Sequence, residues 1–189
     1  MNPMKQPRVS ALLAIVLLAP VATNTAAQEP HTHAAHTTPA ATGATYSGQQ
    51  TRVIKALSPQ EAQDLLDGKG LGLAKAVELN GHSGPMHTLE HADAMKLSSE
   101  QLNQTHELLA KHKAPVKVLG SQLVEAEKAL DTGFAEQRMT TGRITALTND
   151  IGRLQALIRA EHLRTHLEHT ALLSTSQIDQ FKALRGYVN

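Results

Sequence analysis

The sequence predicts an all-α protein: a long antiparallel helical hairpin with short flanking helices. Apolar residues recur at three- and four-residue steps through two long segments, which is the spacing of one face of a helix. Aromatic residues make up 2% of the 189 residues, whereas apolar residues make up 41%. Leucine and alanine must therefore fill the core, and this composition favours helices packed on helices over packed sheets.

Three similar phrases predict where helices begin. Each phrase has the form Leu-Ser-x-x-Glu or Leu-Ser-x-x-Gln. In such a capping box the serine hydroxyl accepts a hydrogen bond from the first helical turn, and the Glu or Gln side chain accepts one from the serine N–H. Pro59 follows the first serine, at a helical position where proline is well tolerated. We expect helices to start at Ser58, Ser98 and Ser174.

Glycine and proline divide the segment before the long helices. The first helix should stop by Gly68, because Gly68, Gly70 and Gly72 form a flexible stretch. A turn of helix should follow over residues 73–79. Pro85 should open a further helix that runs to about Lys96.

The hairpin itself should consist of two long helices that meet near residue 137. Pro115 is expected to interrupt and kink the first of them. A lone hairpin buries little on its outer faces, so we expect a homodimer. A short helix from Ser174 to about Arg185 should end the chain. One face of the second long helix should bury Ile144, Leu147, Ile151, Leu154, Ile158 and Leu167.

The N-terminus has the parts of a cleavable signal peptide, assigned to residues 1–27. Lys5 and Arg8 carry positive charge, residues 11–19 are an unbroken apolar run, and small residues end at Ala27. At about 1.5 Å per residue this run cannot cross a membrane core of roughly 30 Å, so no stable membrane insertion is expected. Retention of the segment as an anchor is the alternative. The expected location is the periplasm.

The mature chain would begin with a polar tail and continue as one helical domain. Residues 28–52 are rich in Thr, Ala, Gly, Pro and Gln, contain three histidines and predict a flexible tail. Residues 53–189 predict the domain. The 18 basic residues fall to 16 without Lys5 and Arg8, against 17 acidic residues, so no nucleic-acid surface is indicated. The absence of cysteine excludes disulfides and thiolate ligands.

The histidines of the domain are grouped rather than scattered. His87 and His91 are four residues apart, as are His162 and His166, and His169 follows one turn later. Such spacing places two imidazoles on one helical face, as in many metal sites. The alternative is that these are solvated polar residues on exposed faces.

When the chain is folded at its predicted turns, the histidine groups lie at the same height along the helical hairpin. Position 112 then lies opposite about 162, and 106 opposite about 168, while His87 and His91 face the same end of the hairpin. Imidazole without thiolate favours zinc, with nickel, cobalt or copper as alternatives. The tail histidines would be a weak metal collector or a spacer. The carboxylates available at this level as ligands or supporting groups are Glu90, Glu107, Glu161 and Glu168.

Enzyme motifs are absent from the sequence. His87 to His91 reads His-Thr-Leu-Glu-His, which is not the His-Glu-x-x-His order of zinc proteases. Neither a Gly-x-Ser-x-Gly elbow nor a phosphate loop nor a dinucleotide fingerprint occurs. We therefore expect a protein that is not an enzyme.

Two of the capping-box phrases, residues 97–101 and 173–177, resemble the LTxxQ motifs of the Spy/CpxP/ZraP group of periplasmic proteins, with serine in place of threonine. The resemblance covers roughly residues 57–187. It implies a cradle-shaped helical dimer whose relatives are ATP-independent chaperones or sensors and binders of zinc, nickel or copper. The metal ligands that it implies are His87 with His91, Glu107, and His162 with His166 or His169.

The sequence therefore supports two functions. The first is a metal-binding stress-response protein that buffers or senses a divalent ion. Its expected partners are a second copy of the chain and a membrane sensor protein. The alternative is a chaperone of unfolded periplasmic proteins. Such a chaperone would be expected to present a basic, partly apolar concave face, whereas this chain is nearly neutral.

Overall fold

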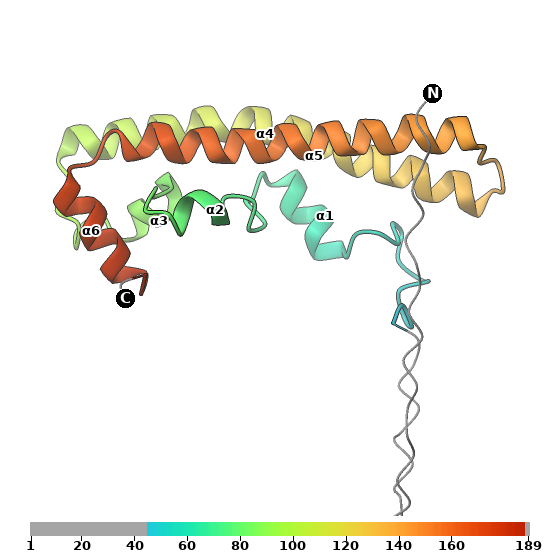
Figure 1. Cartoon of the computed structure of the whole chain (residues 1–189), viewed down its shortest axis with the longest axis horizontal. Helices are drawn as coiled ribbons and strands as arrows, with labels where there is room; N and C mark the ends of the chain where they lie inside the picture. Colours follow the sequence, from blue (N-terminus) through green and yellow to red (C-terminus); the bar gives the residue numbers. More distant parts are fainter. Residues whose placement is uncertain (1–44, 188–189) are drawn as a thin grey trace, which may run out of the picture. The chain divides into compact units, whose positions relative to one another are not determined.

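The computed structural model describes residues 45–187. The chain divides into two units after Thr42, and all the described helices belong to the second unit. The predicted signal peptide and residues 28–44 of the predicted tail lie outside the described residues, while residues 45–52 form turns and bends. The helices are α1 (Pro59–Leu66), α2 (Lys75–Glu78), α3 (Pro85–Glu90), α4 (Ser99–Ala135), α5 (Thr141–Thr170) and α6 (Thr175–Leu184) (Figure 1).

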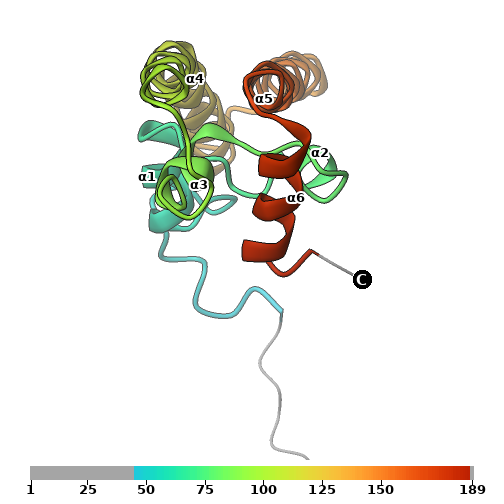
Figure 2. The same cartoon turned by 90° about the vertical axis from the view of Figure 1, so that its left-hand side faces the viewer.

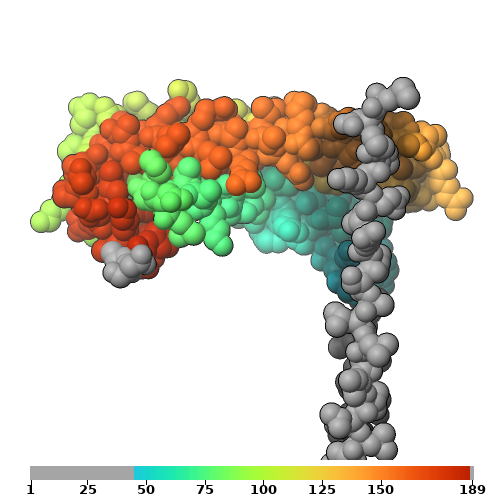
Figure 3. All heavy atoms as spheres, viewed as in Figure 1, coloured from blue at the N-terminus to red at the C-terminus, as the bar shows by residue number. Residues whose placement is uncertain are grey.

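Every regular element in residues 45–187 is a helix, which confirms the predicted all-α class. The long helices α4 and α5 pack against each other. The shorter helices lie on one side of this pair: α1 and α3 contact α4, while α2 and α3 contact α5 (Figure 2). The short helices and α5 form one continuous surface in the space-filling view (Figure 3).

All three predicted helix starts are confirmed. Ser58, Ser98 and Ser174 are the N-caps of α1, α4 and α6, and each forms both arms of a capping box. The first helix ends where predicted, with Gly68 in the left-handed region at φ 68°. The segment that joins α4 to α5 includes Gln137, also left-handed at φ 54°, and lies where the turn was predicted.

Two predictions about the helices are wrong: the end of the helix that begins at Pro85, and the interruption at Pro115; the kink at Pro115 stays a prediction. The helix that begins at Pro85 ends at Glu90 instead of Lys96, because residues 91–96 form turns and Lys96 takes a left-handed φ of 52°. Helix α4 runs through Pro115 without interruption. Proline removes one backbone hydrogen bond from a helix, but Val116 directly after it is buried in the apolar core. Tertiary packing on this turn offsets the local cost.

The glutamines of the second and third capping boxes also bind each other. The Gln101 amide donates to Gln177 Oε1 at 2.9 Å, and the Gln177 amide donates to Gln101 Oε1 at 3.0 Å. Gln101 Nε2 additionally donates to the Leu172 carbonyl at 2.9 Å. Each glutamine therefore caps its own helix and ties the start of α4 to the start of α6.

We expect Gln101→Ala to lower the free energy of unfolding by about 1–2 kcal/mol, because it removes several part-buried hydrogen bonds at once. Urea unfolding of Gln101→Ala, Gln177→Ala and the double variant measures the effect. The sum of the losses in the two single variants should exceed the loss in the double variant by about 0.5 kcal/mol or more, since the two side chains share hydrogen bonds. Additive losses would mean that the reciprocal bonds contribute nothing. Gln104→Ala, on the exposed face of α4, is the matched control.

Candidate functional site

The buried face of α5 changes in character along its length. Ile151, Leu154 and Ile158 are buried in the apolar core. The same helical face then continues with His162, Thr165, His166 and His169, all of them buried. Leu167, predicted to belong to the apolar stripe, is 51% exposed instead. One end of the protein core is therefore made of imidazoles and hydroxyls.

Helix α4 follows the same pattern on the facing side. Thr105 and His112 are buried before Val116 begins the apolar part. His112 and His162 are in edge-to-face contact, with ring centroids 4.6 Å apart. The predicted pairing of position 112 with position 162 is thereby confirmed. Because polar groups are costly to bury without partners, each nitrogen of a buried imidazole is expected to have a hydrogen-bond partner.

Hydrogen bonds set the tautomer of two of these histidines. His166 Nδ1 lies 2.9 Å from the carbonyl oxygen of His82, which can only accept, so Nδ1 carries the proton. His112 Nδ1 lies 2.8 Å from Thr165 Oγ1, whose own proton goes to the Glu161 carbonyl at 2.8 Å. His112 Nδ1 is therefore a donor as well. In the neutral rings the Nε2 atoms of His112 and His166 keep a free lone pair.

His169 has partners at both ring nitrogens. Its Nδ1 donates to the Ser83 carbonyl at 3.0 Å, and its Nε2 lies 3.3 Å from Thr105 Oγ1. The side chain is fully buried. These bonds tie α5 to α4 and to the segment before α3, so His169 joins three parts of the fold.

Two other imidazoles contain a buried nitrogen without a partner among the described residues. They are His162 at Nε2 and His82 at Nδ1. Buried polar atoms in folded proteins are rarely left without a hydrogen bond, and a missing ion or water is a common reason. His162 gives the stronger indication of a missing ion or water, because its whole side chain is buried between His112 and the glycine-rich segment near Gly70.

Burial favours the uncharged form of His112, His162, His166 and His169. It lowers the pKa of His162 from 6.5 to about 4, with further lowering from His112 and His166. The pKa values of His112, His166 and His169 are also lowered, in each case mainly by burial. Neutral imidazole is the form that binds a metal ion, so these groups need not lose a proton to do so at neutral pH.

A cavity of about 900 Å³ lies beside the buried histidines. Its walls come from the segment between α1 and α2, the start of α3, and the facing sides of α4 and α5. His87 is half-buried in this wall, with Nδ1 3.5 Å from Glu78 Oε1. Gly84 approaches the ring of His166 so closely that a Cβ there would lie 2.5 Å from Nε2. The histidines that line the cavity are His87, His112, His162 and His166.

The structure brings together part of the predicted ligand set. His87, His162 and His166 line one cavity. His91 is half-buried at the C-terminal end of α3. Glu107 is exposed and lines a separate small depression with Glu168. Within residues 45–187 no three histidine or acidic side chains are arranged as a ready-made metal site.

Sequence reasoning missed His82 and His112 as members of this group. The signal for His112 was present, since the predicted register placed it opposite His162. His82 contributes through its carbonyl oxygen, and no spacing rule identifies a backbone acceptor. We call His82, His87, His112, His162 and His166 the histidine cluster.

Comparison of the chain with known proteins found no relative. No family model, curated protein or solved structure matches the chain. Among the helices of residues 45–187, none has the length and apolarity needed to cross a bilayer.

Proposed function

We propose that this protein binds a divalent transition metal at the histidine cluster and thereby buffers or senses the ion. The observation that carries the proposal is the buried, unpartnered Nε2 of His162 beside two other imidazoles. The Nε2 atoms of His112 and His166 have free lone pairs, so three nitrogen donors are available. Binding would require the rings to rotate until these donors meet at one ion.

The hydrogen bonds around the cluster support this proposal. Metal-binding histidines usually donate their other ring N–H to a carbonyl, hydroxyl or carboxylate, which orients the ring. His166 does so to the His82 carbonyl and His112 to Thr165 Oγ1. His87 has the Glu78 carboxylate beside its Nδ1. Neutral nitrogen donors without sulfur favour zinc, with nickel, cobalt or copper(II) as alternatives.

Thermal melting of the untagged protein with each metal tests the proposal. A metal at a hundred times its Kd should raise the free energy of unfolding by about 2.7 kcal/mol, seen as a higher Tm. We expect His162→Ala and His166→Ala to remove most of this shift, because each removes one donor. A Tm that none of zinc, nickel, cobalt or copper raises would contradict metal binding.

Two controls separate the cluster from other histidines. His106→Ala changes an exposed histidine of the same helix as His112, so the metal shift should remain. Replacing the tail histidines His31, His33 and His36 with glutamine should also leave it. A shift that disappears with the tail variant and survives in His162→Ala would place the metal on the tail and reject the cluster.

The remaining parts of the proposal concern the setting. We propose an exported, periplasmic homodimer, in which the second copy covers exposed apolar residues of the long helices. Val118, Phe134 and Leu167 are each more than half exposed on α4 and α5, and exposed apolar surface of this kind favours association. Sedimentation of the chain without residues 1–27 measures the oligomeric state. A membrane sensor protein is proposed as an interaction partner.

A chaperone of unfolded periplasmic proteins is the second candidate, favoured by one observation. Several large apolar side chains on the short-helix side are at least 40% exposed, and they are Leu66, Leu71, Leu79, Met86 and Leu184. Such surface can hold exposed apolar segments of a client. An aggregation assay with a reduced, unfolding client tests this. Unchanged aggregation at equimolar protein would reject the chaperone function without affecting the metal test.

A further inference from the structure

Three glycines form part of the wall of the cavity beside the histidine cluster. Gly68, Gly70 and Gly72 run along one side, in the segment between α1 and α2. A Cβ at Gly70 would meet only the His162 ring, at 3.8 Å. The cavity has a volume of about 900 Å³, near the upper end of the range for small-molecule sites.

The walls of this cavity are mainly apolar. Leu71, Leu79, Met86 and Leu109 contribute aliphatic and thioether surface, and Tyr187 also lines the cavity. Leu71, Leu79 and Met86 are 42%, 54% and 49% exposed. An apolar body of a ligand would cover these side chains and remove their surface from water.

The charges around the cavity are not balanced. Five basic and three acidic side chains line it. Two of the acids already have partners, because Asp64 pairs with Lys69 at 2.8 Å and Glu78 pairs with Arg185 at 3.1 Å. Lys75, Lys113 and Lys117 also line the cavity and form no ion pair within the described residues.

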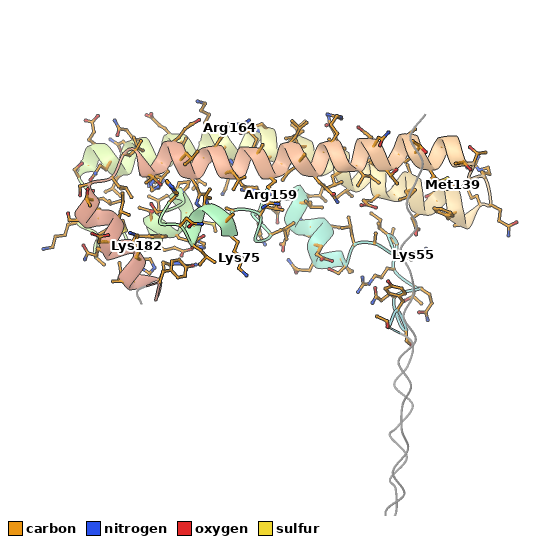
Figure 4. All side chains as sticks on the ribbon, in the orientation of Figure 1. Lys55, Lys75, Met139, Arg159, Arg164 and Lys182 are labelled. Atoms are coloured by element: carbon orange, nitrogen blue, oxygen red, sulfur yellow. The ribbon has the colours of Figure 1, made fainter. Side chains whose placement is uncertain are left out.

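Two of these lysines repel each other. Lys113 and Lys117 are four residues apart on α4, so they lie on one face of the helix. The stem of Lys117 is held against the wall, since its Cγ lies 3.2 Å from where a Cβ at Gly68 would be. Lys75 projects from α2 on the side away from the long helices (Figure 4). An anionic group between Lys113 and Lys117 would relieve the repulsion.

We propose that this cavity binds an amphipathic organic anion: an aliphatic or aromatic body that carries one carboxylate or sulfonate. The body lies against Leu71, Leu79 and Met86, and the anionic group lies near Lys113 and Lys117. This ligand differs from a metal ion and needs none. All measurements are therefore made with EDTA present, so that failure of the metal proposal leaves this one testable.

The test uses two fluorescent probes that differ mainly in charge. 8-Anilinonaphthalene-1-sulfonate is the anion, and N-phenyl-1-naphthylamine is its uncharged counterpart. We expect the full chain to bind the sulfonate at one saturable site, with dodecanoate displacing it and dodecanol displacing it weakly. The uncharged probe should bind about tenfold more weakly. Equal affinity for both probes would overturn the assignment of an anion site.

Variants locate the binding. Lys113→Gln with Lys117→Gln should weaken sulfonate binding about fivefold to tenfold, since each exposed charge contributes modestly. Lys128→Gln, an exposed lysine of the same helix outside the cavity, should leave it unchanged. Because both lysines are exposed, these changes do not threaten the fold. Unchanged affinity in the double variant would overturn the proposal.

A filling variant tests the cavity itself. Gly70→Leu places a side chain in the space without left-handed backbone strain, and we expect it to abolish saturable binding. Gly152→Leu adds the same side chain to an exposed glycine of α5 with nothing within 4 Å, and binding should persist. Circular dichroism confirms that both variants are folded. Equal binding by both would place the probe on exposed apolar surface elsewhere and reject the cavity.

Discussion

Lowering the pH from about 7.5 to about 4 is expected to lower the free energy of unfolding by about 3 kcal/mol through His162 alone. The buried ring has a pKa of about 4 in the folded protein, against 6.5 for an ordinary histidine. Between these values the unfolded chain binds the proton and the folded protein does not. Stability is therefore full above about pH 6.5 and is lost progressively as the pH falls toward 4.

Three other histidines act in the same direction. Burial lowers the pKa values of His112, His166 and His169, so each adds to the loss in acid. Glu127 acts in the opposite direction, because its own burial raises the pKa of its carboxyl group and acid removes an unfavourable charge. Four histidines against one carboxyl group should leave a net loss of stability in acid.

Urea unfolding at several pH values, with EDTA present, measures this effect. The window from about pH 6.5 to 5 is the most informative, since ordinary carboxyl groups are still charged there. His162→Gln should flatten the pH dependence in this window, whereas His106→Gln, on the exposed face of α4, should leave it unchanged. A stability that stays constant from pH 7.5 to 5 would contradict the buried, neutral state of the histidines.

Gly120→Ala is expected to lower the free energy of unfolding by about 2–3 kcal/mol. Gly120 lies in the middle of α4 where the end of α1 crosses it. A Cβ there would fall on the carbonyl oxygen of Leu65 and lie 2.8 Å from its carbonyl carbon. Backbone atoms cannot move aside as a flexible side chain can, so α1 must shift away from α4.

Gly152→Ala is the matched control for this substitution. Gly152 is an exposed glycine inside α5, and a Cβ there would meet nothing within 4 Å. Replacing glycine with alanine in an open helical position stabilises by about 0.5–1 kcal/mol. Urea unfolding should thus give changes of opposite sign for the two variants. The same sign for both would mean that α1 does not pack on Gly120 as closely as described.

The shift of α1 in Gly120→Ala should also change the shape of the cavity. Helix α1 leads directly into the glycine segment that forms one wall, and Gly68 lies against the stem of Lys117 on α4. When α1 moves away from α4, this wall moves with it. Binding of the anionic probe by Gly120→Ala should therefore weaken together with stability, even though Gly120 does not line the cavity.

Local features of this fold could be predicted well from the sequence. Ser58, Ser98 and Ser174 cap their helices through atoms no more than three residues away, and interactions that short need no tertiary contact to be recognised. The pairing of His112 with His162 was also accessible, because two long helices joined by a short turn have a register that can be counted.

Other features depended on contacts that no local pattern contains. The apolar period on α5 suggested Leu167 as a core residue, yet the buried face turns to His162, Thr165 and His166. Those polar residues can be buried only because partners on α4 and before α3 satisfy them, as the His82 carbonyl does for His166. Propensity likewise suggested a break at Pro115, which packing around Val116 overrides.

Composition, spacing and capping act within a few residues, so the helical class, the helix starts and the grouping of the histidines could be predicted without tertiary contacts. The folded arrangement is needed to know which imidazoles are buried, which ring nitrogens of His112, His162 and His166 are left free, and that a cavity lies beside them. Burial and hydrogen-bond satisfaction depend on residues that are distant in the chain. His162 and Gly70 lie far apart in sequence and meet only in the folded protein.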